Sequence, residues 1–305
     1  IPAVDGLRPY RSIGQDEKDA VNSVLDSQCL SGFYGSSGPE FLGGPAVRTF
    51  EEQWTDRFGV RFAVSVNSNT SGLIAAMGAI GLSPGDEVIV PSWSMSATAI
   101  APLFYGGIPV FADIEEETFC IDPSEVEEKI TEKTRAVIAV NLFGHPAQLA
   151  KLRSLADEKN IFLIEDNAQA PLAQEGDRLC GTVGDIGVYS LNYHKHIHTG
   201  EGGVIVTNDS RFAEKVSLIR NHAEAVVGKR DVTDIINMIG FNFRMGEMEA
   251  AIGICQLNKG PHLINQRREN VAYLESKLYG INGLTLPVVR EGCEHVYYVH
   301  PIWLR

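Results

Sequence analysis

The sequence has few basic residues and contains no long hydrophobic run. Its 305 residues include 26 Lys or Arg and 39 Asp or Glu, so the formal net charge is −13. This acidic balance argues against a broad electrostatic contact with nucleic acid or an anionic membrane. No apolar stretch approaches the roughly 18 residues that a membrane span needs, and the first residues lack the apolar core of a signal peptide. We therefore expect neither a nucleic-acid nor a membrane partner.

Cysteine is also scarce, and its spacing excludes two classes of small domain. The five cysteines lie far apart and form no Cys-x-x-Cys pair. This argues against a zinc ribbon and against a dense disulfide framework, and it favours a reducing cytoplasm. The hydrophobic content of 44%, with 30 Gly and 14 Pro, excludes disordered, collagen-like and coiled-coil proteins.

What the sequence does contain is a regular alternation of strand-like and helix-like segments. Short runs rich in Val and Ile occur at 62–67, 87–90, 109–113, 136–141, 161–166, 186–191 and 203–208. Between them, apolar residues recur at helical spacing, as in Leu149, Leu152 and Ala156. This alternation predicts an α/β fold with a mainly parallel central sheet flanked by helices.

The segments on either side of this core predict the domain organisation. Helices are expected at 16–27 and 47–59, separated by a Gly/Ser-rich loop at 31–45 whose length favours a functional role. Downstream, a helix at 246–260 is expected to stop at Gly260, and a second one to follow at 262–279. We expect an N-terminal arm and a large domain over 1–280, and the start of an incomplete small α/β domain over 281–305.

Chemistry-bearing residues follow three of the predicted strands. Ligands of parallel sheets bind outside the carboxyl ends of the strands. The segment 68–72 (Ser-Asn-Thr-Ser-Gly) opens a helix, where free backbone N–H groups suit a phosphate, although it could also be an ordinary N-cap. Asp166 ends an apolar strand and needs a positive partner if it is buried.

Lys195 lies between the predicted strand at 186–191 and a glycine-rich turn. Desolvation there would lower its pKa and make its amine a nucleophile toward an aldehyde. His194, His196 and His198 alternate around it and could share one face to bind a metal. Because no cluster of Asp, Glu or Cys stands nearby in the sequence, we favour a polar turn lining a pocket and predict no metal.

These parts together match the needs of one cofactor. Pyridoxal 5′-phosphate (PLP) needs an amine for a Schiff base, a carboxylate for its ring nitrogen, and N–H or hydroxyl donors for its phosphate. Lys195, Asp166, Ser190 and the 68–72 segment would supply them. PLP is therefore the predicted cofactor.

Several strings resemble the DegT/DnrJ/StrS family of PLP-dependent sugar aminotransferases from about residue 8 to the end of the chain. They include EDNAQA at 165–170, GDIGVYSLNYHKHIHTGEGGVIVTND at 184–209 and GFNFRMGEMEAAIG at 240–253. The resemblance implies the fold-type I transferase architecture. It also implies transfer of an amino group, typically from glutamate, to a keto group of a nucleotide-linked sugar.

The same resemblance assigns roles to single residues. Lys195 would form the Schiff base and move protons, Asp166 would pair with the ring nitrogen, and Gln169 would lie beside the ring hydroxyl. The phosphate would be bound by Asn69, Thr70 and Ser190 and, from the neighbouring subunit, by Asn242, which implies a homodimer with shared active sites. Candidates for contacting the sugar nucleotide are His194, His196, Arg220, His222, Lys229, Arg230 and Arg244.

The chain departs from the family pattern at three places. Met95 occupies the position of an aromatic residue that usually stacks on the cofactor ring, so either Met95 or the nearby Trp93 would cover it. Asn69 replaces a usual glycine, which is tolerable because Asn visits left-handed backbone conformations comparatively easily. The family also continues beyond the segment that HVYYVHPIW resembles, so the small C-terminal domain is expected to be incomplete.

Two alternatives stay open. A sugar dehydratase branch resembles this chain but carries His at the lysine position, whereas the register from Ser190 and from Gly200 places Lys195 there. A non-catalytic PLP-binding regulatory protein could also use such a lysine and a dimer. The loop at 31–45 and the positive residues near 220–244 argue against it.

Overall fold

The computed structural model describes residues 11–223, 226–229 and 238–304. Its centre is a seven-stranded sheet in the order β1-β9-β8-β5-β4-β2-β3. The strands are β1 (Phe62–Val66), β2 (Glu87–Pro91), β3 (Ile108–Ala112), β4 (Thr134–Val140), β5 (Phe162–Asp166), β8 (Ile186–Ser190) and β9 (Gly203–Thr207). β9 runs antiparallel to both its neighbours, and the other pairings are parallel. The predicted strands and the mainly parallel sheet are confirmed.

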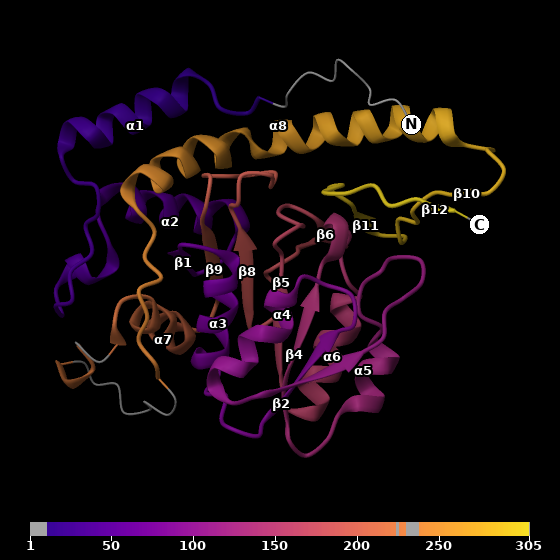
Figure 1. The fold of residues 1–305 in the computed structure, drawn as a ribbon, viewed down its shortest axis with the longest axis horizontal. Helices are drawn as coiled ribbons and strands as arrows, with labels where there is room; N and C mark the ends of the chain where they lie inside the picture. The colour runs from indigo at the N-terminus through magenta and orange to yellow at the C-terminus, as the bar shows by residue number, and fades with distance from the viewer. Residues whose placement is uncertain (1–10, 224–225, 230–237, 305) are drawn as a thin grey trace.

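Helices cover both faces of this sheet (Figure 1). Helices α3 and α7 pack on one face, and α2, α5, α6 and part of α8 pack on the other. The helices are α1 (Gln15–Ser27), α2 (Pro45–Phe58), α3 (Asn69–Ala79), α4 (Ser96–Ile100), α5 (Pro123–Lys129), α6 (Leu149–Lys159), α7 (Ser210–Arg220) and α8 (Glu247–Leu278). In Figure 1, α8 extends along the side of the sheet toward which the arrowheads of β4 and β8 point.

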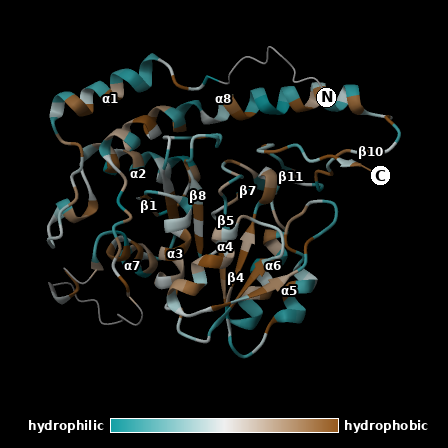
Figure 2. Cartoon of the chain, viewed as in Figure 1, coloured by the Kyte–Doolittle hydropathy of each residue, from teal (hydrophilic) through white to brown (hydrophobic). Residues whose placement is uncertain are grey.

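The strands read as continuous apolar runs because both faces of the sheet are buried. Successive side chains of a strand point to opposite faces. Val188 of β8 accordingly joins the core cluster that contains α3, whereas the next residue, Tyr189, joins the cluster that contains α2. Figure 2 shows the hydrophobic colour on these strands and hydrophilic residues on the outer helices.

Short strands follow α8 and return to the large domain. β11 (Cys293–Glu294) pairs with β6 (Gln174–Glu175), which also pairs with β7 (Arg178–Leu179). β10 (Leu284–Thr285) pairs with β12 (Trp303–Leu304). The short strands expected after residue 281 are therefore present, whereas the domain boundary at 280 stays a prediction.

The predicted break in α8 is wrong. One helix of 32 residues continues through Pro261, where two helices were expected. Proline removes one backbone hydrogen bond, but α8 packs along α1 and α2. A side-chain carbon on Gly260 would lie 3.1 Å from Ile197, so the missing side chain permits this close packing. Even so, no helix in the described ranges is long and apolar enough to cross a membrane.

Two buried histidines lie where the C-terminal segment meets the large domain. His145 Nε2 accepts a hydrogen bond from the Arg290 amide at 3.1 Å, so its proton is on Nδ1, which lies 2.7 Å from the Pro146 carbonyl. The His295 ring centre is 5.5 Å from that of His145. Burial lowers the pKa of His145 to about 4 and that of His295 to about 3. Both side chains are therefore neutral in the folded protein.

We expect acid to destabilise the fold through these histidines. Below their ordinary pKa of 6.5, the unfolded chain binds protons that the folded chain does not, so stability falls as the pH falls from about 6.5 toward 4. For His145 alone the loss is about 3 kcal/mol at pH 4. Urea unfolding at several pH values measures it, and His145→Gln should reduce the loss between pH 7 and pH 4. An equal loss in the variant would contradict the assignment.

Candidate active site

The carboxyl ends of β1, β5 and β8 bring together four residues that the sequence predicted. α3 begins directly after β1 with Asn69, Asp166 ends β5, and Ser190 ends β8 just before Lys195. β5 and β8 are parallel neighbours, with Asp166 paired to Val188. The Asn69 side chain donates to the Val188 carbonyl at 3.2 Å and so joins the start of α3 to β8.

Asp166 is the most enclosed charged group of this cluster, with 3% of its surface exposed. Its Oδ1 accepts hydrogen bonds from the Ala168 amide at 3.1 Å and from Asn69 at 3.3 Å, and its Oδ2 accepts one from Thr98 at 3.2 Å. Burial raises the pKa of Asp166, whereas these donors and the positive charge of Lys195 oppose that rise. The carboxylate needs a cation or strong donors to stay ionised.

Lys195 is buried as well, with 8% of its surface exposed. Burial lowers its pKa to about 8, and the negative charge of Asp166 limits the decrease. Its Nζ lies 4.2 Å from the ring centre of Tyr298, close enough for a cation–π contact. Tyr298 was not predicted as a site residue. Its aromatic side chain within the HVYYVHPIW segment was the sequence feature that could have indicated this contact.

The N-terminus of α3 offers two backbone donors to an anion. Ser68 caps the helix: its Oγ accepts from the Ser71 amide at 3.0 Å, and its carbonyl accepts from the Gly72 amide. Within the described part of the chain, no hydrogen bond from the amides of Asn69 or Thr70 is found. Free amides at the positive end of a helix dipole are a ready anion site.

This donor set fits PLP. The free amides of α3 suit the phosphate, the buried Asp166 carboxylate suits a protonated ring nitrogen, and the Lys195 amine of lowered pKa suits the aldehyde. A glycine permits the close approach of strand and helix at this point. A side-chain carbon on Gly203 of β9 would lie 2.7 Å from the carbonyl of Ser68.

Other residues predicted to contact the cofactor lie around this cluster. Gln169 Oε1 accepts from the Phe143 amide at 2.6 Å, and Ser190 Oγ accepts from the Asn192 amide at 3.3 Å. Trp93 is 51% exposed and Met95 is 73% exposed. Both precede α4, the helix whose Thr98 reaches Asp166. Which of them covers the cofactor ring stays a prediction.

Arg220 lies inside the protein, which corrects the expectation that it contacts a substrate. It is 0% exposed, and its guanidinium forms a 2.5 Å ion pair with Glu51 and a 3.0 Å hydrogen bond to the Ser65 carbonyl. It also lies over the Phe33 ring. A buried guanidinium needs such partners, so Arg220 holds α7, α2 and β1 together.

The histidines around Lys195 have different surroundings. His194 is exposed, whereas His196 is fully buried with its Nε2 2.8 Å from the Val296 carbonyl, so burial corrects the expectation that His196 meets a substrate. His198 Nε2 lies 2.6 Å from Ser12 Oγ. Over residues 11–223, 226–229 and 238–304, no three His, Cys, Asp or Glu side chains are placed to hold a metal ion.

The remaining candidates lie near the loop that precedes α8. Asn242 is exposed, and its side-chain oxygen accepts from Arg244 Nε at 2.8 Å. His222 is half-buried and its amide donates to the Phe241 carbonyl, so these three residues are close together. The Lys229 side chain and Arg230 fall outside the described parts of the chain.

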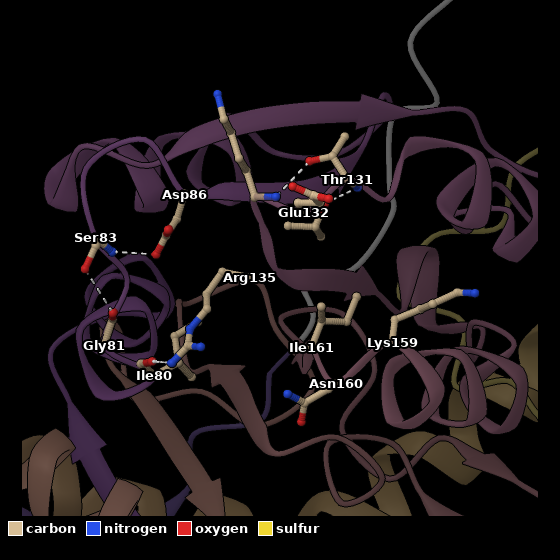
Figure 3. Close-up of a pocket in the computed structure, with 12 residues that line it drawn as sticks. Ile80, Gly81, Ser83, Asp86, Thr131, Glu132, Arg135, Lys159, Asn160 and Ile161 are labelled. Atoms are coloured by element: carbon tan, nitrogen blue, oxygen red, sulfur yellow. Dashed lines mark hydrogen bonds between the residues drawn. The ribbon is translucent and has the colours of Figure 1, made fainter.

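A separate cavity lies at the opposite edge of the sheet (Figure 3). It is lined by residues next to the amino ends of β2, β4 and β5, among them Asp86, Thr134 and Ile161. Arg135 there donates to the Ile80 carbonyl at 3.0 Å, and acidic and basic side chains are mixed. This cavity is thus not part of the Asp166 and Lys195 cluster.

Comparisons with known proteins agree with PLP as the cofactor. The chain is 36% identical over 258 residues to GDP-perosamine synthase from Escherichia coli O157:H7, covering 85% of this chain and 67% of that protein. The crystal structure of S. venezuelae DesV, in complex with a ketimine intermediate, matches with a TM-score of 0.84 and 32% identity. That match covers 94% of this chain and 73% of the other.

A second solved structure shows that the same fold occurs with a different activity. The E. coli GDP-4-keto-6-deoxy-D-mannose-3-dehydratase with bound hydrated PLP matches with a TM-score of 0.85 and 29% identity, covering 97% of this chain and 78% of that one. The family model of the DegT/DnrJ/EryC1/StrS aminotransferases matches residues 12–305. Because that match spans nearly the whole sequence, the chain belongs to the DegT/DnrJ/EryC1/StrS aminotransferase family.

Proposed function

We propose that the chain is a PLP-dependent aminotransferase that moves an amino group, from a donor such as glutamate, to a keto group of a nucleotide-linked sugar. Family membership and the named activity of the GDP-perosamine synthase relative support this activity. The observation that carries it is the buried Lys195 amine, which interacts electrostatically with the buried Asp166 carboxylate at the same edge of the sheet. Burying charged groups costs free energy, so the burial of both groups indicates that the site has a function.

Each residue of the cluster has a distinct task in this reaction. Bound PLP supplies an electron sink that stabilises negative charge on the carbon next to the transferred nitrogen. The neutral form of Lys195 Nζ takes a proton from carbon and returns it, which its pKa of about 8 permits near neutral pH. The Asp166 carboxylate holds the proton on the ring nitrogen. The amides of Asn69 and Thr70, with Ser190, bind the phosphate.

The identity of residue 195 favours aminotransferase over dehydratase chemistry. The fold alone does not separate the two, because a dehydratase chain matches it closely. Lys195 supplies a primary amine that can bond to an aldehyde and move protons, whereas an imidazole in its place could only move protons.

The protein is proposed to act in the cytoplasm, since its five cysteines are all free.

We also propose a homodimer whose active sites are shared. Large apolar side chains are exposed on α4 and on the 3₁₀ helix that follows it (Ala101–Tyr105), among them Ile100, Leu103 and Phe104. Such a patch on a protein surface marks an interaction site. The Phe104 ring lies 6.3 Å from that of Phe241, the neighbour of the exposed Asn242. If a second copy covered this patch, Asn242 of each subunit would lie near the cofactor phosphate of the other subunit.

Lys195→Ala should abolish covalent capture of the cofactor. Apoprotein is incubated with PLP and treated with borohydride, and the peptides are then examined by mass spectrometry. The native protein should retain the cofactor on Lys195, and the matched control Lys151→Ala, which removes an exposed lysine on α6, should retain it equally. Retention of the adduct in Lys195→Ala would refute the assignment.

The same preparation separates the aminotransferase from a regulatory PLP-binding protein. Unreduced holoprotein should lose its PLP absorbance band when glutamate or another amino donor is added, because the amino group passes to the cofactor. The band should return when a keto sugar nucleotide is supplied. A band that no amino acid changes would favour the regulatory protein.

Mixing two impaired variants tests the shared sites. Lys195→Ala and Asn242→Ala are unfolded together, refolded and assayed at limiting PLP. Half of the randomly formed dimers are mixed and one of their two sites is intact, so about a quarter of the native activity should return. A mixture no more active than the average of the separate variants, or a monomer in sedimentation, would contradict the proposal.

A further inference from the structure

The Asp166 carboxylate is held through both of its oxygens by side chains from two other elements. Asn69, at the start of α3, reaches Oδ1, and Thr98, inside α4, reaches Oδ2. Both donors are buried, so water does not replace them easily. The second donor to Oδ1 is a backbone amide, that of Ala168. Asn69 and Thr98 are therefore the donors that a change of side chain would remove.

These two contacts favour the ionised carboxylate. Burial alone disfavours a charge at this position, and hydrogen bonds donated to the charged form act against that effect. Hydroxyl and amide donors both stabilise the charged form of a carboxyl group over its neutral form. Without them, Asp166 would more readily take up a proton, and a neutral carboxyl group would no longer balance a positive ring nitrogen.

The Asn69 side chain is thus directed away from the role that the sequence suggested for this residue. Its Nδ2 donates to Asp166 and to the Val188 carbonyl, whereas its backbone amide remains at the helix end. Asn69 therefore contributes only its backbone amide, beside that of Thr70, to the proposed phosphate site. Thr98 is linked further to Ser94 by a 2.9 Å hydroxyl contact, which connects Asp166 to the segment that carries Trp93 and Met95.

We propose that Asn69 and Thr98 are positioning residues that keep the Asp166 carboxylate ionised and fixed in one orientation for pairing with the cofactor's ring nitrogen. The inference rests on the proposed function, because it concerns the same site. It goes beyond that function by assigning the Asn69 side chain to the ring end of the cofactor and by adding Thr98, which the sequence did not single out.

The test compares two probes on the apoprotein: PLP, and deaza-PLP, in which CH replaces the ring nitrogen. Deaza-PLP keeps the aldehyde and the phosphate but cannot pair with Asp166. Asn69→Ala and Thr98→Val should each weaken PLP binding about tenfold, as expected for a lost hydrogen bond to a charged group. Both variants should leave deaza-PLP binding nearly unchanged. Dissociation constants from protein fluorescence provide the readout, with no activity measurement.

Two further variants serve as controls. Thr98→Ser keeps the hydroxyl and should restore PLP binding to near the native value. Ser190→Ala, which removes the hydroxyl of the proposed phosphate site, should weaken both probes by the same factor. Circular dichroism on each variant confirms the native fold before binding is measured.

The outcomes separate this inference from the function beneath it. Equal weakening of both probes by Asn69→Ala and Thr98→Val would show that these side chains act through the phosphate or the general fold, and would overturn the inference alone. Unchanged binding of PLP would overturn it as well. A native apoprotein that binds neither probe would overturn the proposed function and this inference together.

Discussion

The burial of two groups of opposite charge, the Asp166 carboxylate and the Lys195 ammonium, is the constraint on which the site depends. Each alone would favour its neutral form, because burial raises the pKa of Asp166 and lowers that of Lys195. Their mutual attraction opposes both shifts. Asn69 and Thr98 add hydrogen bonds to the carboxylate. The start of α3, helix α4 and the ends of β5 and β8 must therefore meet at one point.

The apolar sheet makes that meeting precise. Its central strands are buried on both faces, so packing with α3 on one side and α2 on the other fixes their positions. Charged groups are tolerated at the strand ends, where donors are available. The same rule explains Arg220, whose buried guanidinium is balanced by Glu51 and backbone carbonyls and which serves packing instead of ligand binding.

Much of this architecture was predictable because it depends on local periodicity. Seven strands were recognisable as Val- and Ile-rich runs, and Asp166 and Lys195 stood out because they follow such runs. Prediction failed where distant packing overrides a local preference. The helix at 246–260 was expected to stop at Gly260, but α8 packs against α1 and α2 and continues through Pro261. Arg220 was expected at a ligand site because a diphosphate needs cations, and nothing near Arg220 in the sequence indicates its ion pair with the distant Glu51.

By itself, the sequence determined the α/β alternation, the positions of Asp166 and Lys195 at strand ends and the cofactor that they suit, since each depends on residue order over short spans. Only the tertiary structure decided which groups surround them. Thr98 reaches Asp166 across 68 positions of the chain, and Tyr298 lies over Lys195 from the far C-terminal segment. Such contacts depend on how layers pack, and packing is a property of the whole core that no short span of sequence contains.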